Sequence, residues 1–106
     1  MRNALRLCLG VMISGAVLMG ADAAAGKAAY DRACKSCHGA DGAPNPKIAA
    51  AMKVEMLHLG AKEVQALSDA ELKAIIVDGK GKMKPVRSVS GGDADNVVAY
   101  VRSLKK

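Results

Sequence analysis

The chain of 106 residues is poor in aromatic side chains: it has no tryptophan, no phenylalanine and only two tyrosines, Tyr30 and Tyr100. So short a chain struggles to bury enough apolar surface when large flat side chains are scarce. The same shortage argues against nucleic-acid binding, because bases need aromatic platforms to stack on and no recognition motif is present. The composition therefore predicts that a flat bound group completes the core, and that the chain folds poorly without that group.

Cysteine is also scarce, with three residues in the chain, and this excludes an extensive disulfide framework. Two of the three stand close together in the sequence Cys34-Lys35-Ser36-Cys37-His38, which has the pattern C-x-x-C-H. Two thiols three positions apart can each add to a vinyl group of one haem, and the histidine that follows can ligate its iron. We therefore predict one haem c per chain, attached to Cys34 and Cys37, with His38 as an iron ligand.

Other interpretations of this motif are weaker. A structural zinc site would need a second pair of cysteine or histidine ligands, and none follows in the sequence. A thioredoxin-like redox pair would need alternating strands and helices around it, and the flanking sequence does not resemble strands. A chance match of three fixed positions in five residues is the remaining alternative.

The first 23 residues have the pattern of a secretory signal peptide. Arg2 and Arg6 precede an uncharged stretch, and Ala21-Asp22-Ala23 offers a cleavage site with small residues at the two key positions. A membrane anchor is the alternative, but the uncharged stretch is shorter than the roughly 20 apolar residues that span a bilayer. We predict a cleaved signal peptide at 1–23 and a monohaem domain at 24–106, exported to the periplasm without a membrane span.

A second cleavage site after Ala25 would start the mature chain at Gly26 instead. With either site, Cys8 leaves with the signal peptide. The full chain has a formal net charge of +6 and stays basic after this cleavage. A basic surface favours partners with acidic docking surfaces.

Helix signals dominate the rest of the sequence, so we predict an all-α fold. A short helix over 26–33 leads into the motif. Ser68 and Glu71 form a capping box for a helix over 69–78, which Gly79 ends in a left-handed conformation. Residues 90–104 form the last helix, with Ser90 as its N-cap.

Between the motif and the capping box, the sequence predicts a loop over 39–47, a short helix over 48–52 and an extended connection over 53–59. A histidine that ligates iron generally donates its other ring N–H to an acceptor, and the Pro46 carbonyl is our candidate acceptor for His38.

The extended connection supplies two further candidate haem contacts, Leu57 and Leu59. His58, between them, is expected at the surface or beside a haem propionate. Its alternative role is that of an iron ligand.

Met83 lies in the loop from Gly79 to Pro85, among glycines and lysines, where a methionine has no obvious role in a core. A thioether is a suitable sixth ligand for haem iron, and the distance along the chain from His38 lets the two residues reach opposite haem faces. Met52 and Met56 are the competing methionines, and both are better explained as core residues.

Together these residues resemble the class I c-type cytochromes, most closely the small bacterial monohaem kind. The resemblance includes Gly26, Tyr30, the C-x-x-C-H motif, Met83 and Tyr100. It implies a small cytochrome c fold, with helices wrapped around one covalently attached haem and the first and last helices crossing at Gly26. It also implies that Tyr30 pairs with Tyr100, and that His38 and Met83 ligate the iron. One departure is that Lys84 separates Met83 from Pro85, whereas many members have proline directly after the ligand methionine.

The predicted function is single-electron transfer between redox partner proteins by a monomer, not enzyme catalysis. The basic residues Lys80, Lys82, Lys84 and Arg87 are a candidate docking rim, and their alternative is a solvated loop. Two other functions stay open. The chain could be a haem subunit of a larger redox complex. It could also be a ligand-binding sensor or a peroxidase-like protein, if the Met83 ligand is labile.

Overall fold

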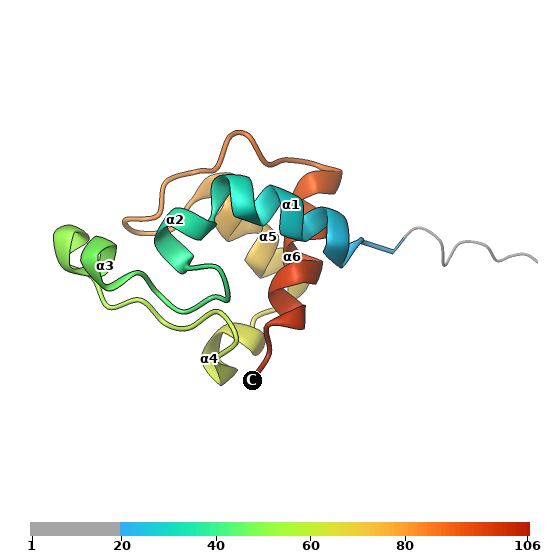
Figure 1. Cartoon of the computed structure of the whole chain (residues 1–106). Helices are drawn as coiled ribbons and strands as arrows, with labels where there is room; N and C mark the ends of the chain where they lie inside the picture. Colours follow the sequence, from blue (N-terminus) through green and yellow to red (C-terminus); the bar gives the residue numbers. More distant parts are fainter. Residues whose placement is uncertain (1–19) are drawn as a thin grey trace, which may run out of the picture.

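A computed structural model describes residues 20–106, so nearly all of the predicted signal peptide at 1–23 lies outside the described part. Within these described residues, six helices follow one another: α1 (Ala23–Ala33), α2 (Lys35–His38), α3 (Pro46–Met52), α4 (Lys62–Gln65), α5 (Asp69–Asp78) and α6 (Gly92–Ser103) (Figure 1). Residues 20–106 contain no strand, only one isolated bridge between Lys80 and Met83. The predicted all-α fold is confirmed.

Helices α1 and α6 cross at Gly26, as the resemblance implied. A Cβ atom at Gly26 would lie 1.8 Å from the carbonyl oxygen of Asn96, so no other residue fits without separating the helices. One turn further along α1, the rings of Tyr30 and Tyr100 pack with centroids 4.9 Å apart and planes tilted by 56°. This tilted arrangement is favourable for aromatic pairs. The crossing therefore depends on one glycine and on the only two aromatic residues in the chain.

The core fills the space between α1, α5 and α6. Besides Tyr30 and Cys34, its buried members are small or aliphatic: Ala29, Leu72, Ile76, Val89, Ala94, Val97, Val98 and Val101. Two surface ion pairs also join α5 to α6, from Lys73 to Asp95 at 3.1 Å and from Arg102 to Asp69 at 2.8 Å. Exposed pairs of this kind contribute little stability, so the apolar contacts hold these helices together.

Helix α5 begins and ends at the predicted residues, Asp69 and Asp78. The Ser68 hydroxyl accepts the N–H of Glu71, and the Glu71 carboxylate accepts the N–H of Ser68, which confirms the capping box. The conformation predicted for Gly79 is wrong in part. Its φ of 82° is positive, but its ψ of 170° is extended rather than helical, because the chain turns directly into the Met83 loop.

Several other boundaries differ from the prediction. Helix α1 starts at Ala23 because Asp22 caps it, and α3 starts at Pro46, inside the predicted loop 39–47. Ser90 is not the N-cap of α6: that position is Gly91, with a φ of 55° and no side-chain cap. The short helix α4 was not predicted, and no side chain caps it. Positive φ at Gly91 redirects the chain one residue after Ser90, which takes the serine hydroxyl out of capping position.

No helix within residues 20–106 combines the length and apolarity that crossing a membrane requires.

Candidate haem-attachment site

The predicted motif lies on and just before α2, at the end of α1. Cys34 is the residue between the two helices, and its side chain belongs to the core with 8% exposure. Cys37 and His38 are half-buried, and both cysteines are free thiols. Burial raises the pKa of the Cys34 thiol to about 11, so the thiol is protonated at neutral pH. One helical turn thus presents two thiols and an imidazole from neighbouring positions.

Helix α2 has only four residues, too few to be stable through its own hydrogen bonds. Asn45 supplies part of the missing support from beyond the following loop. Its side-chain amide donates to the Ser36 carbonyl at 3.2 Å, and its backbone N–H donates to the Cys37 carbonyl at 3.0 Å. The Asn45 side chain also caps α3, where its oxygen accepts the N–H of Lys47 at 3.0 Å. Asn45 therefore fixes α2 and α3 relative to each other.

The end of α2 is held from the other side by the two tyrosines. The Tyr30 hydroxyl donates to the carbonyls of His38, at 3.3 Å, and Gly39. The Tyr100 hydroxyl donates to the carbonyl of Ala40 at 3.2 Å. Hydroxyls from the α1–α6 crossing thus contact three successive backbone carbonyls, starting at the predicted iron ligand.

The His38 side chain lacks the partner predicted for it. Its Nδ1 atom is buried and makes no hydrogen bond to any residue that the structure describes, so the predicted contact with the Pro46 carbonyl is not formed. Pro46 is exposed as the first residue of α3, where its carbonyl belongs to the helix. Burial lowers the pKa of His38, which favours the neutral imidazole that binds metals. A buried neutral imidazole beside two free thiols fits the donor set of haem c.

Met83 lies in a tight turn whose ends, Lys80 and Met83, exchange both backbone hydrogen bonds, at 2.8 and 2.9 Å. Gly81, with a φ of 58°, occupies a central position of this turn. A Cβ atom at Gly79 would lie 2.7 Å from the Met83 carbonyl oxygen and 2.9 Å from Pro85. Pro85 thus closes the loop against Gly79 although Lys84 separates it from Met83. The half-buried Met83 is held by a defined turn instead of the flexible loop that its glycines suggested.

The segment before α4 contains the predicted leucines. Leu57 is 47% exposed, and Leu59 packs against the core and donates its N–H to the Gly42 carbonyl at 3.0 Å. The Nδ1 atom of His58 accepts the N–H of Gly60 at 2.8 Å. His58 thus uses one of its two ring nitrogens for a hydrogen bond within its own turn.

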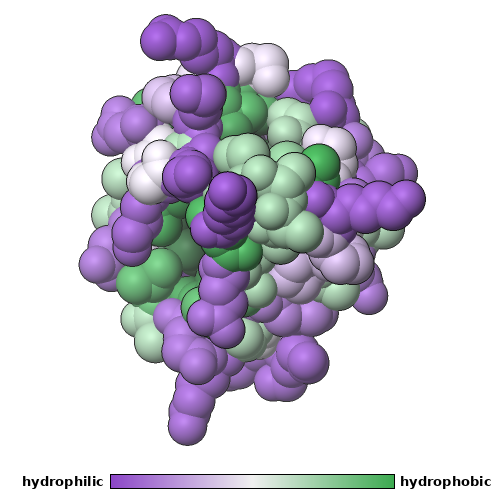
Figure 2. Space-filling view, turned by 90° about the vertical axis from the view of Figure 1, so that its left-hand side faces the viewer, coloured by the Kyte–Doolittle hydropathy of each residue, from purple (hydrophilic) through white to green (hydrophobic). Residues whose placement is uncertain are grey.

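Loop 79–85 contacts α3 through Lys82, whose ammonium donates to the Met52 carbonyl at 3.1 Å. Lys80, Lys84 and Arg87 are exposed. Figure 1 shows α2, α3 and this loop at one end of the molecule. Figure 2 faces that end, and apolar atoms are recessed there between hydrophilic side chains.

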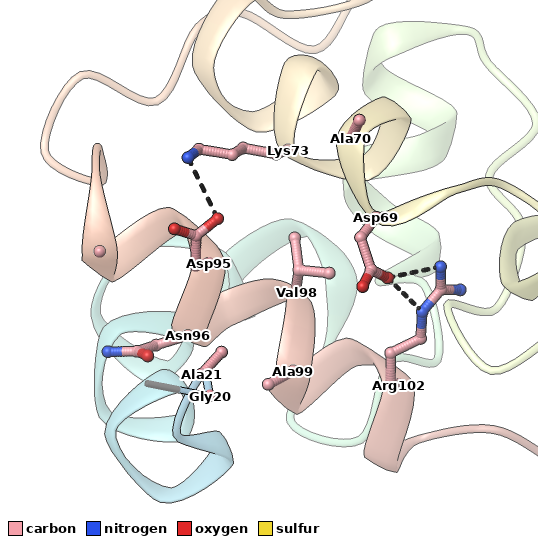
Figure 3. A pocket seen from close by; sticks show the side chains of 11 residues that line it. Gly20, Ala21, Asp69, Ala70, Lys73, Asp95, Asn96, Val98, Ala99 and Arg102 are labelled. Atoms are coloured by element: carbon pink, nitrogen blue, oxygen red, sulfur yellow. Dashed lines mark hydrogen bonds and ion pairs between the residues drawn. The ribbon is translucent and has the colours of Figure 1, made fainter. Parts of the chain in front are cut away.

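A separate hollow of about 490 Å³ lies between α5, α6 and the segment before α1 (Figure 3). Ion pairs Lys73–Asp95 and Asp69–Arg102 occupy its rim. None of the predicted haem residues lines it. This hollow is therefore distinct from the candidate site.

Sequence reasoning missed Asn45 and the hydroxyl contacts of Tyr30 and Tyr100. An asparagine followed by proline is typical of an N-cap and first helical position, so the capping role of Asn45 was detectable. Its bonds to α2 were not, because they depend on how the loop folds back.

Two cysteines and a histidine on one helical turn, next to crossing terminal helices, are the arrangement expected of a c-type cytochrome. Comparison with known proteins agrees. A family model described as cytochrome C oxidase, cbb3-type, subunit III matches residues 21–101, and the chain belongs to this family. A solved structure titled KustC0563 c-type cytochrome is 28% identical, with a TM-score of 0.64, over 76% of this chain and 98% of that chain. The comparison with curated proteins found no match. The protein is thus a small class I c-type cytochrome that carries electrons through covalently bound haem c.

Proposed function

We propose that this chain is a periplasmic single-electron carrier with one haem c, bound through Cys34 and Cys37 and ligated by His38 and Met83. The observation that carries the proposal is the half-buried His38, whose buried Nδ1 atom has no partner among the described residues, presented on one helical turn with both cysteines. Bound haem would supply a one-electron couple at its iron. The periplasmic location rests on the signal-peptide pattern of residues 1–23.

The residues around His38 hold the ligand in place. Bonds from Asn45 and Tyr30 fix the backbone of α2, so little movement of His38 is available when the charge of the iron changes. Burial lowers the pKa of His38, which favours the unprotonated imidazole with a nitrogen lone pair for the metal. This arrangement suits rapid electron transfer, since a fixed ligand reorganises little.

The Met83 turn is the proposed source of the second axial ligand. Its paired backbone hydrogen bonds and the contact of Pro85 with Gly79 limit the positions that Met83 can adopt. A thioether from a restrained loop would keep the sixth position filled and so suppress binding of oxygen or carbon monoxide. His58, the alternative ligand, already engages its Nδ1 atom in a hydrogen bond with the N–H of Gly60.

The test is a reductive titration of the holoprotein together with carbon monoxide binding. We expect one electron per chain, full reversibility and slow carbon monoxide binding to the ferrous form. Rapid binding would contradict a stably filled sixth position and would favour the sensor or peroxidase-like function instead.

A second candidate function is that of a haem subunit in a larger redox complex. The observation in its favour is the matching family, whose description names a subunit of an oxidase. Co-purification of the tagged chain with other redox subunits from solubilised membranes would support this function. A monomer in the periplasmic fraction would support the free carrier.

A further inference from the structure

Both tyrosines donate hydrogen bonds from their hydroxyls to backbone carbonyls at the end of the motif and directly after it. Tyr30 donates to His38 and Gly39, and Tyr100 donates to Ala40. The two rings pack on each other at the α1–α6 crossing. Packing alone needs no hydroxyl, and phenylalanine has the same ring. The hydroxyls therefore require a separate explanation.

Of the two tyrosines, Tyr30 is the better candidate for a specific role, because it is fully buried with 0% exposure. Burying a hydroxyl without a partner is costly, so its bonds to the His38 and Gly39 carbonyls are needed as soon as tyrosine occupies this position. Tyr100 is only half-buried, and its bond to Ala40 lies further from the ligand.

The Tyr30 hydroxyl has one proton to donate, and its nearer acceptor is the Gly39 carbonyl, directly after α2. The carbonyl of His38, the last residue of α2, lies further away at 3.3 Å. A helix leaves its final carbonyls without partners from its own turn, and α2 is too short to restrain them otherwise. The imidazole of His38 is attached to the same residue as this carbonyl. A change in its backbone would therefore rotate the ring that is proposed to bind the iron, much as a hydrogen bond from a neighbouring residue orients a metal ligand.

We propose that Tyr30 is a positioning residue. Its hydroxyl sets the orientation of the His38 imidazole through the backbone carbonyls of His38 and Gly39. This inference rests on the proposed ligation by His38. It assigns to Tyr30 a function beyond packing at the helix crossing.

The test compares Tyr30→Phe with Tyr100→Phe in the haem-loaded protein. Both variants keep the ring pair and remove one hydroxyl that donates to the same segment of backbone. We expect Tyr30→Phe to shift the reduction potential and the paramagnetically shifted NMR signals of the His38 ring. Tyr100→Phe should leave both close to the wild-type values.

A merely structural hydroxyl would give a different result. Tyr30→Phe would then unfold at lower denaturant concentration, with the potential and the His38 signals unchanged, and the proposal would be overturned. Equal spectroscopic shifts in both variants would overturn it as well. If the wild type lacks the NMR signals of a His38 ring bound to iron, the proposed ligation by His38 is wrong. This outcome differs from the outcomes that overturn the positioning role of Tyr30 alone.

A second measurement applies if Tyr30→Phe does not accumulate with haem. In the Tyr100→Phe background, 3-fluorotyrosine can be incorporated at the one remaining tyrosine, position 30. The fluorinated hydroxyl is a stronger donor and keeps the ring in place. A shift of the His38 signals on fluorination would support the proposal, and unchanged signals would overturn it.

Discussion

Gly26 sets the distance between α1 and α6, because only a hydrogen atom fits between its Cα and the backbone of Asn96. The overlap involves a backbone carbonyl, which cannot rotate away as a flexible side chain could. At this position a single methyl group therefore affects the packing of the whole crossing, including the Tyr30–Tyr100 pair.

We expect Gly26→Ala to lower the free energy of unfolding of the holoprotein by about 3 kcal/mol, the upper part of the range for overpacking. Chemical denaturation followed by circular dichroism measures this. Gly92→Ala is the matched control, because a Cβ atom at Gly92 would meet nothing within 4 Å. The control should be neutral or more stable by about 0.5 kcal/mol. Equal effects in both variants would contradict the close approach at Gly26.

Residues whose chemistry depends on sequence spacing could be predicted, and residues that act through long-range contacts could not. The C-x-x-C-H motif alone predicts Cys34, Cys37 and His38, because its three functional groups are neighbours in the chain. The predicted partner of His38, Pro46, was wrong because the proline starts α3 instead of lining the loop. The roles of Asn45 and of the Tyr30 hydroxyl depend on how distant segments pack.

At the scale of elements, helices with strong local signals were predicted best. The capping box located α5 to the residue, whereas α6 begins at Gly92 because the Gly91 backbone, and not the Ser90 hydroxyl, directs its start. Helix α1 also begins earlier than predicted, at Ala23, where the Asp22 carboxylate accepts two backbone N–H groups. The missing side-chain caps thus explain the errors at α4 and α6, whereas the caps of α1 and α3 are well formed and were overlooked in the sequence.

Ser68→Ala tests the capping box, with Ser90→Ala as its matched control. We expect Ser68→Ala to lower the free energy of unfolding by about 1 kcal/mol, typical of a lost N-cap. The Ser90 hydroxyl caps no helix, so its removal should have little effect. Thermal unfolding of both variants provides the comparison. Equal losses of stability would show that the capping box stabilises the protein no more than the Ser90 hydroxyl does.

The capping box also makes stability depend on pH. Hydrogen bonds from the backbone N–H and the hydroxyl of Ser68 lower the pKa of Glu71 below its usual 4.5. The folded chain therefore holds this proton less tightly than the unfolded chain. The stabilisation is fully present above pH 4.5 and is lost as the pH falls through the folded pKa. Glu71→Gln should flatten this part of the acid unfolding curve, and an unchanged curve would contradict the account.

The N-cap of α1, Asp22, lies next to the predicted cleavage site after Ala23. Cleavage after Ala23 would remove Asp22, together with its backbone bond to the Asn96 side chain at 2.9 Å. We expect a chain that starts at Ala24 to be less stable by about 1 kcal/mol than one that starts at Asp22. Thermal unfolding of the two holoproteins measures the difference, and equal stability would show that the cap contributes nothing.

At the scale of the molecule, one end of the cytochrome combines the motif, α3 and the Met83 loop (Figure 1). Met52 and Leu57 leave 37% and 47% of their surface exposed, although both are large and apolar, so the prediction that Met52 is a core residue is wrong. The fold class followed from helix signals and the motif. The shape of this end could not be predicted, because it depends on contacts such as Lys82 with Met52 that join distant segments.

Charge reversal tests whether this end is the docking surface. We expect Lys80→Glu/Lys84→Glu to slow electron transfer to an acidic redox partner severalfold at low salt and to weaken its dependence on ionic strength. Stopped-flow kinetics across a salt series measures both effects. Lys62→Glu/Lys105→Glu changes the net charge equally, at a basic hollow beside α4. If the control slows transfer as much, net charge and not a docking rim controls the rate.

The ligand pair of the iron is the central claim, and the optical spectrum of the ferric holoprotein tests it most directly. We expect a weak far-red band from methionine sulfur bound to iron in the wild type. The band should disappear in Met83→Ala and persist in Met52→Ala and Met56→Ala, which remove the competing methionines. Absence of the band from the wild type, or its survival in Met83→Ala, would contradict ligation by Met83 and the electron carrier built on it.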